Sequence, residues 1–167
     1  MVHCQDVLFE VDDWFEEAIP APTTKNVHTQ LGCHFEEVAE MVHTLTANDL
    51  KTSLLLLKAH DALHALGNHL KASDNVVSVA PKDQVDLLDA LCDQIVTAVG
   101  VGYMLKLDVP FALEEVNDSN WSKFVDGKPI FDLNGKIQKG PDYFKADLTP
   151  FIPQTSESSE PKTATGA

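Results

Sequence analysis

The spacing of the apolar residues most constrains the fold of this chain. They recur every three or four positions over long segments that contain no proline, which is typical of amphipathic helices. The segments are residues 5–18, 25–45, 49–71, 82–106 and 111–124. Proline pairs and polar turns separate them and end each helix. The sequence therefore predicts an all-α fold, a bundle of four to five helices.

The segment 82–106 is the most apolar of the five. Its apolar residues are distributed nearly all round the helix, which predicts a central, buried helix. Gly100 and Gly102 lie near its end and would allow a neighbouring segment to approach closely.

The C-terminal part of the chain has a different character. Residues 127–137 alternate between polar and apolar and contain Asn134-Gly135, which predicts a short β-hairpin. From about Gln154 the chain is rich in Ser, Thr, Glu, Pro and Lys, which predicts disorder. We therefore expect one domain over residues 1–150 and a disordered tail over 151–167.

The charge of the chain argues against two classes of partner. The formal net charge is −14, and all twelve basic residues are lysines. This balance argues against nucleic acids and anionic membranes. The three cysteines are an odd number without metal-type spacing, and no signal peptide or membrane-spanning run is present. We expect a soluble protein of the cytoplasm.

A first acidic cluster lies on the predicted helix 25–45. Glu36 and Glu37 are adjacent, and Glu40 lies four and three positions after them, respectively. The three carboxylates therefore share one side of that helix. A solvated acidic face is the simplest interpretation of such a cluster considered alone.

A second acidic cluster lies on the most apolar helix. Asp86, Asp89 and Asp93 share one face there, where a purely solvated face is a weaker explanation. Two acidic faces on two helices could close around hard cations such as Mg²⁺, which take oxygen ligands. We therefore predict a metal site between the two helices.

Beyond the two clusters, a set of short motifs resembles a known family. After Glu36-Glu37-x-x-Glu40 and the segment Asp93-Gln94-Ile95-Val96-Thr97-Ala98-Val99-Gly100 come an N-x-x-K segment and a lysine-rich tail. The segment is Asn120-Trp121-Ser122-Lys123, and the tail runs from Asp126-Gly127-Lys128-Pro129 to Lys139-Gly140-Pro141-Asp142-Tyr143. Over about residues 5–150 the chain resembles the MazG-like all-α nucleoside triphosphate pyrophosphohydrolases, in their phage and integron branch.

The resemblance implies a Mg²⁺-dependent enzyme, with Mn²⁺ as the alternative metal. It implies cleavage of a (deoxy)nucleoside triphosphate to the monophosphate and pyrophosphate, in control of nucleotide pools. Glu37 and Glu40 match the metal ligands of the first helix, and Asp93 matches the last ligand of the second. Ala90 stands where the family has a glutamate three positions earlier, so we take Asp89 as its replacement and Asp86 as the next candidate.

The same resemblance places Asn120 and Lys123 at the phosphates, and Lys139 and Tyr143 in the substrate-binding tail. We assign Glu36 to orient or deprotonate the attacking water. Trp14 is most simply a core residue; the alternative is that it stacks on the base, in a pocket that also holds His28 and Gln30.

The family also forms dimers or tetramers, so we expect a homo-oligomer. One alternative function is a non-enzymatic acidic helical protein that binds a protein partner. Another is a di-iron carboxylate bundle, suggested by Glu40-x-x-His43 and Asp61-x-x-His64. His60 and His64 have a spacing that suits Zn²⁺, but no third ligand is evident, and we interpret them as surface residues.

Overall fold

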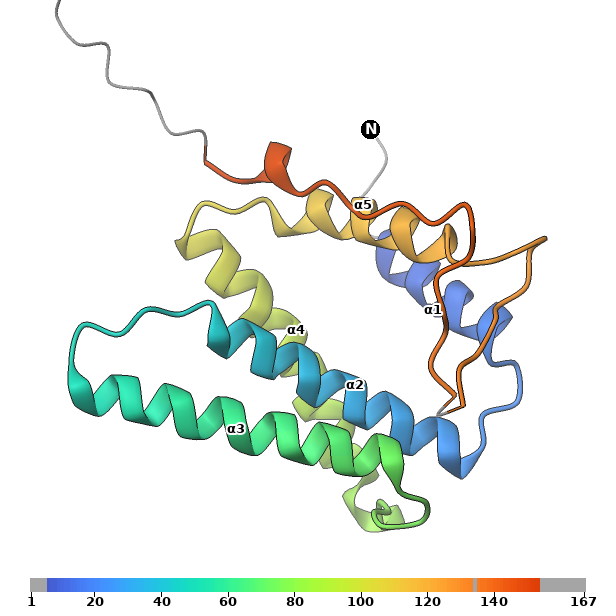
Figure 1. Ribbon diagram of the computed structural model, residues 1–167, viewed down its shortest axis with the longest axis horizontal. Helices are drawn as coiled ribbons and strands as arrows, with labels where there is room; N and C mark the ends of the chain where they lie inside the picture. Colours follow the sequence, from blue (N-terminus) through green and yellow to red (C-terminus); the bar gives the residue numbers. More distant parts are fainter. Residues whose placement is uncertain (1–5, 134, 154–167) are drawn as a thin grey trace, which may run out of the picture.

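The computed structural model describes residues 6–133 and 135–153, and over these ranges the chain is helical (Figure 1). The helices are α1 (Asp6–Ala18), α2 (Thr24–His43), α3 (Leu50–Ala72), α4 (Gln84–Met104) and α5 (Val109–Trp121), with short 3₁₀ turns at Pro81–Asp83 and Thr149–Phe151. The predicted all-α fold is confirmed, and each predicted helix is present within a few residues of its expected bounds.

The beginnings of α2 and α3 are fixed by side-chain caps. The Thr23 hydroxyl accepts from the backbone N–H of Asn26, whose side chain accepts in return from the Thr23 N–H, so the two form a capping box. Asp49 caps α3 by accepting from the Thr52 N–H at 2.9 Å. These caps explain why the chain resumes a helix directly after the Pro20–Pro22 loop and after the 44–48 break.

The two capped helices form an antiparallel hairpin, the most extensive helix pair of the fold (Figure 1). They cross at Gly32 and Gly67, both of which are buried. A Cβ added to Gly67 would meet the Gly32 carbonyl oxygen at 2.8 Å, and one added to Gly32 would meet the Gly67 carbonyl oxygen at 2.7 Å. The backbones approach this closely because neither position has a side chain.

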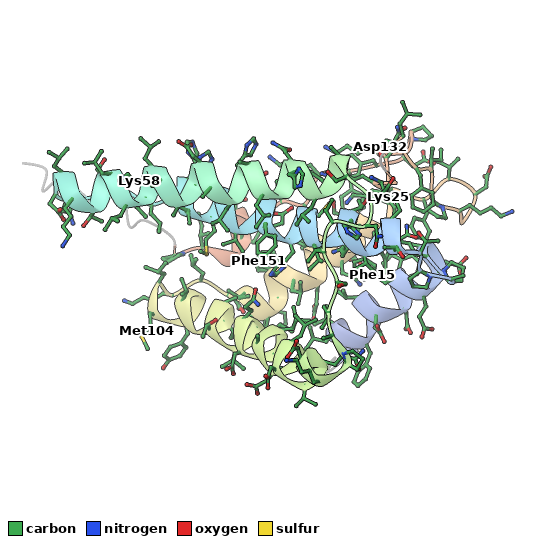
Figure 2. The ribbon with its side chains drawn as sticks, turned by 90° about the horizontal axis from the view of Figure 1, so that it is seen from below. Phe15, Lys25, Lys58, Met104, Asp132 and Phe151 are labelled. Atoms are coloured by element: carbon green, nitrogen blue, oxygen red, sulfur yellow. The ribbon has the colours of Figure 1, made fainter. Side chains whose placement is uncertain are left out.

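The prediction that the most apolar helix is central and buried is wrong. Residues 84–99 of α4 are all exposed, and α4 lies on the opposite side of α2 from α3 (Figure 2). One side of α4 faces α2 across a cavity: Leu91 lines this cavity together with residues of α1 and α2, and His34 Nε2 donates to Gln94 Oε1 at 2.5 Å. The apolar residues all round α4 therefore do not mean that this helix is buried within a single chain.

The two glycines of α4 behave differently. The Gly102 backbone lies against Val109 at the sharp bend into α5, where an added Cβ would clash with that side chain. An added Cβ at Gly100 would meet no atom within 4 Å. The predicted close approach is therefore confirmed for Gly102 and wrong for Gly100.

The segment after residue 140 runs back along α5 (Figure 1). The Ser119 hydroxyl donates to the Phe144 carbonyl oxygen at 2.8 Å, and the Asp147 N–H donates to Glu115 Oε1 at 3.0 Å. At the far end, the Asp108 N–H donates to the Phe151 carbonyl oxygen at 2.9 Å. These bonds hold the segment through Phe151, and the predicted tail beyond residue 153 lies outside the described residues.

The predicted β-hairpin does not form as a pair of strands in the described part of the chain. Only isolated bridges occur there, Val125 with Lys128 and Phe131 with Ile137. The turn itself is tight, since the Asp132 N–H donates to the Lys136 carbonyl oxygen at 2.9 Å. A two-stranded ribbon without a third strand is marginal, and Pro129 interrupts its first side.

Within the described ranges, no single helix has both the length and the apolarity needed to cross a membrane. One bent pair, Pro81–Met104 with Val109–Trp121, reaches the required length and composition, with an angle of 118° between its two parts.

Candidate functional site

A pocket of about 180 Å³ lies where α1, α2 and the end of α5 meet the loop that follows α5. It contains four of the residues predicted for the site, Trp14, Glu37, Asn120 and Lys123. The other lining residues are Phe15, Ile19, Asn26, Thr29, Gln30, Cys33, Gly135, Lys136 and Ile137. The fold thus gathers predicted residues that are more than a hundred positions apart in the sequence.

The apolar wall of this pocket belongs to the small core of the described chain. Trp14 is only 7% exposed and packs edge-on against Phe15, with ring centroids 4.9 Å apart, and against Phe124 at 5.7 Å. The prediction of Trp14 as a core residue is confirmed. Its Nε1 atom is buried and has no hydrogen-bond partner among the described residues, so one donor beside the pocket is unsatisfied there.

The end of α5 supplies a paired amide and ammonium group. Lys123 Nζ donates to Asn120 Oδ1 at 2.6 Å and lies 6.0 Å from the centre of the Trp14 ring. Burial lowers the pKa of Lys123, and nearby Lys136 and Lys139 lower it further, while Tyr143 and Glu37 oppose them. A crowded, partly desolvated ammonium group is a strong site for an anion.

Lys139 and Tyr143 also lie near this ammonium group. Lys139 Nζ is 4.6 Å from the centre of the Tyr143 ring, a cation–π contact. Hydrogen bonding with the Ser119 side chain lowers the pKa of Tyr143, and the charges of Lys139 and Lys123 act in the same direction. The structure therefore brings Lys139 and Tyr143 to the neighbourhood in which the sequence predicted them.

Glu36 is engaged by two lysines. Lys71 Nζ lies 2.7 Å from Glu36 Oε1 and Lys136 Nζ lies 3.4 Å from Glu36 Oε2. The hydrogen bond from Lys71 is the main cause that lowers the pKa of Glu36, against a smaller opposing effect of burial. A carboxylate held ionised in this way is a weak base, so its contacts suit it better to position Lys136 than to deprotonate water.

The predicted metal ligands divide into two separate sets. Glu37 lines the pocket, and Glu40 is exposed three residues further along α2. Asp89 and Asp93 are each two residues from Leu91, the residue of α4 that faces α2, so each lies about 160° from Leu91 around the helix axis. They therefore point away from Glu37 and Glu40.

Among the described residues, no group of three or more His, Cys, Asp and Glu side chains could hold a metal ion. The predicted set of Glu37, Glu40, Asp89 and Asp93 thus does not fit a single Mg²⁺ site within one chain. Within this set, Glu37 and Glu40 suit a cation on a bound phosphate, because both lie on α2, the helix that lines the pocket.

A second cavity of about 410 Å³ opens next to the pocket and shares Phe15, Ile19, Asn26 and Gln30 with it. Its remaining walls are Pro22, Val27, Leu31, His34 and Leu91, so it is an open cleft between α1, α2 and α4. The shared residues make the two cavities neighbours, one mainly apolar and one lined in part by Lys123 and Lys136.

His28, which the sequence suggested for base recognition, serves another purpose. Its side chain is fully buried, and Nδ1 donates to the Thr24 carbonyl oxygen at 2.7 Å. Nε2 accepts from the backbone N–H groups of Val76 and Val77 at 3.0 and 3.2 Å. Nε2 holds the segment after α3 against α2, and Nδ1 fixes the ring to its own helix. Of His28 and Gln30, only Gln30 lines the two cavities.

Sequence reasoning missed the part that Lys71 and Lys136 play together. They approach Glu36 from α3 and from the loop after α5, respectively. The position of Lys136 in the lysine-rich loop was a signal that could have found it. The sequence contains no such signal for Lys71, because only the crossing of α2 and α3 places this residue beside α2.

No family model, no curated protein and no solved structure matches this chain.

Proposed function

We propose that the chain is a nucleoside triphosphate pyrophosphohydrolase that cleaves between the α- and β-phosphates. One observation carries the proposal: Lys123, Lys136 and Asn120 converge with Glu37 on one pocket. Two ammonium groups and an amide suit a phosphate chain, and the adjoining apolar cavity is large enough for a nucleobase. The resemblance to the MazG-like family, which rests on the same residues, agrees with this assignment.

In the proposed reaction one water attacks, the bond between the α- and β-phosphates breaks, and the nucleoside monophosphate and pyrophosphate leave. Lys123 and Lys136 hold the phosphate oxygens and balance the charge that develops on the leaving pyrophosphate. Asn120 orients the Lys123 ammonium group through its 2.6 Å hydrogen bond, and Glu36 holds Lys136. Lys139 and Tyr143 extend the same surface for the substrate.

Mg²⁺, or Mn²⁺ in its place, would be held by Glu37 and Glu40. When bound, such an ion neutralises phosphate oxygens and lowers the pKa of a coordinated water. Within a single chain, Asp89 and Asp93 have no part in this proposal, because they face away from α2.

The test is a screen of the eight common ribo- and deoxyribonucleoside triphosphates for release of pyrophosphate, with and without Mg²⁺. We expect turnover of at least one nucleotide, with equal amounts of monophosphate and pyrophosphate. Release of orthophosphate alone, or no turnover with any nucleotide, would overturn the proposal.

A second candidate is a non-enzymatic helical adaptor, which the exposed apolar side chains of α3 and α4 favour. Thermal unfolding separates the two candidates. An enzyme is stabilised by Mg²⁺ with a non-hydrolysable triphosphate, through the mass action of the ligand. An adaptor shows the same midpoint with and without them.

A further inference from the structure

Trp14 has a buried hydrogen-bond donor that the described chain does not satisfy. Among residues 6–133 and 135–153, its Nε1 atom is the only buried side-chain nitrogen or oxygen without a hydrogen-bond partner. Buried indole N–H groups usually have a partner, so an unpaired one requires an explanation. Because Trp14 lines the pocket of about 180 Å³ together with Lys123 and Lys136, a molecule bound in that pocket is the natural source of the acceptor.

The Trp14 ring is enclosed by other side chains. The residue is 7% exposed, and its ring packs against Phe15 and Phe124 with centroids 4.9 and 5.7 Å away. Lys123 Nζ lies over the ring, 6.0 Å from its centre. A stacked nucleobase needs a free ring face, so the N–H at the ring edge is the part of Trp14 that is left to contact a ligand.

The surroundings of this N–H group indicate which kind of acceptor it takes. An indole N–H and an ammonium group can only donate hydrogen bonds. The ammonium groups of Lys123 and Lys136 line the same pocket as Trp14. A ligand that serves all three donors needs several acceptor oxygens and a negative charge, and a phosphate group has both. A neutral base or sugar would leave the two ammonium groups without a counter-charge.

The spacing of the donors suits one phosphate group. Each of its oxygens accepts hydrogen bonds at about 2.9 Å, so bonds to two of its oxygens can span the 6.0 Å between Lys123 Nζ and the centre of the indole ring. Trp14 comes from α1, whereas Lys123 follows directly after α5, and these two helices lie side by side (Figure 1). A phosphate group held in this way would therefore be bound from two elements at once.

A buried water molecule is the competing acceptor. Ordered waters commonly pair with buried polar groups that the protein itself leaves unsatisfied. A site that serves only to hold water would not respond to an added oxyanion. The experiment below is designed to separate the two cases.

We propose that Trp14 Nε1 donates a hydrogen bond to a phosphate oxygen of the ligand that Lys123 and Lys136 hold. Trp14 then contacts the substrate through the edge of its ring and helps to position the phosphate chain. The inference rests on the proposed function for the identity of the ligand, and it adds a binding residue to the proposed site.

The test follows the indole N–H groups of the full chain by ¹H–¹⁵N nuclear magnetic resonance. The chain has two tryptophans, and Trp121→Phe leaves the Trp14 indole peak alone and so assigns both. Trp121 is the matched control, because its ring also contacts Phe124, at 5.3 Å, but does not line the pocket. Pyrophosphate is added with and without Mg²⁺, and sodium chloride of the same ionic strength is added to a parallel sample.

We expect pyrophosphate to move the Trp14 indole proton downfield and to slow its exchange with solvent, while the Trp121 peak stays in place. A non-hydrolysable nucleoside triphosphate should have the same effect, and sodium chloride should have none. An unmoved Trp14 peak with both phosphate compounds overturns the proposal. So does a shift caused by a mixture of the four deoxyribonucleosides but not by pyrophosphate, because the acceptor would then lie on the base or sugar.

A second measurement removes the donor and keeps the ring. Trp14→Phe would leave a void in the small core, so Trp14 is replaced in the Trp121→Phe chain by benzothienylalanine, in which sulfur takes the place of the indole N–H. The dissociation constant of pyrophosphate should rise about tenfold, or about 1.4 kcal/mol. The unfolding midpoint of the ligand-free chain should stay the same or rise, because an unpaired buried donor is removed. An unchanged dissociation constant, or a lower midpoint, contradicts the proposal.

The outcomes also separate this inference from the proposed function. Pyrophosphate release from a nucleotide with an unmoved Trp14 peak would keep the enzyme and remove Trp14 from its binding site. A Trp14 shift with pyrophosphate, without turnover of any nucleotide, would keep the phosphate site and overturn the proposed reaction.

Discussion

The Lys71 ammonium group donates a 2.7 Å hydrogen bond to Glu36 Oε1 and so joins α3 to α2 within the candidate site. Both side chains are largely shielded, with 15% of the lysine and 20% of the glutamate side chain exposed. The pair lies next to the Gly32–Gly67 crossing, since a Cβ on Gly32 would touch Lys71 Cγ. The ion pair therefore depends on the close approach of the two helices.

This pair predicts a pH-dependent contribution to stability. Because the folded state lowers the pKa of Glu36, its contribution is present above the pKa of an unfolded glutamate, about 4.3, and disappears as the pH falls through the lower folded value. Glu36→Gln should reduce the free energy of unfolding by about 2 kcal/mol at pH 7. Urea titrations should show this difference shrinking below about pH 4.

Glu40→Gln is the matched control, since it is an exposed carboxylate on the same helix. Its effect on the free energy of unfolding should stay within about 0.5 kcal/mol. An equal loss for Glu36→Gln at pH 7 and pH 3 would show that shape, and not charge pairing, gives Glu36 its effect.

The helix crossing predicts that Gly67→Ala destabilises the protein. Alanine favours a helix over glycine by about 1 kcal/mol, but here its methyl group would lie 2.8 Å from the Gly32 carbonyl oxygen. Backbone cannot move aside as a flexible side chain can, and such overpacking costs about 1–3 kcal/mol. We expect a net loss of stability in chemical denaturation.

Gly100→Ala is the control for this prediction, because the added methyl group meets no atom within 4 Å. It should raise the free energy of unfolding by about 0.5–1 kcal/mol. If Gly67→Ala is also stabilising, the two helices are further apart than the structure places them.

The helices were predictable because each carries its own local signal. Thr23 and Asp49 cap their helices through side chains that the sequence displays, and apolar spacing marks the helical segments. The convergence of Asn120, Lys123 and Glu37 on one pocket also agrees with their selection from motifs.

Other features were not predictable, because they depend on which surfaces meet. Asp89 and Asp93 share a helix face, as expected, but a sequence does not state toward which neighbour that face turns. Their angle to Leu91 is fixed by helix geometry, and only the position of Leu91, which lines the same cavity as residues of α2, shows that they point away from α2. Lys71 reaches Glu36 for a similar reason, through a helix crossing that two separate glycines permit.

The burial of His28 leads to a third prediction. His28→Leu has nearly the same volume but removes the hydrogen bonds that the N–H groups of Val76 and Val77 donate to the ring. A hydrogen bond of this kind contributes about 1 kcal/mol, so the free energy of unfolding should fall by about 2 kcal/mol. His69→Leu, at an exposed position of α3, is the control and should change little. Hydrogen exchange should be faster at the amides of residues 76 and 77 in His28→Leu, and unchanged exchange there would contradict the assignment.

The last prediction tests Lys123 as the phosphate-binding group. Lys123→Met keeps the length of the side chain and removes its charge, so it should lower kcat/KM for pyrophosphate release by about 10²–10³-fold, or about 3–4 kcal/mol of transition-state stabilisation. The free energy of unfolding should stay the same or rise, because burial opposes the charged form of this lysine.

Lys128→Met makes the same chemical change at an exposed position of the following turn and should leave kcat/KM within about twofold.

The pH dependence of kcat/KM gives a second test of Lys123. Because burial lowers the pKa of Lys123 below the ordinary lysine value of 10.5, the parent enzyme should lose kcat/KM on the alkaline side before pH 10.5, as the ammonium group loses its proton. Lys123→Met should lack this alkaline limb. If the limb persists in Lys123→Met, another group titrates there, and if both methionine variants lose activity equally, the effect comes from net charge and Lys123 does not bind the phosphates.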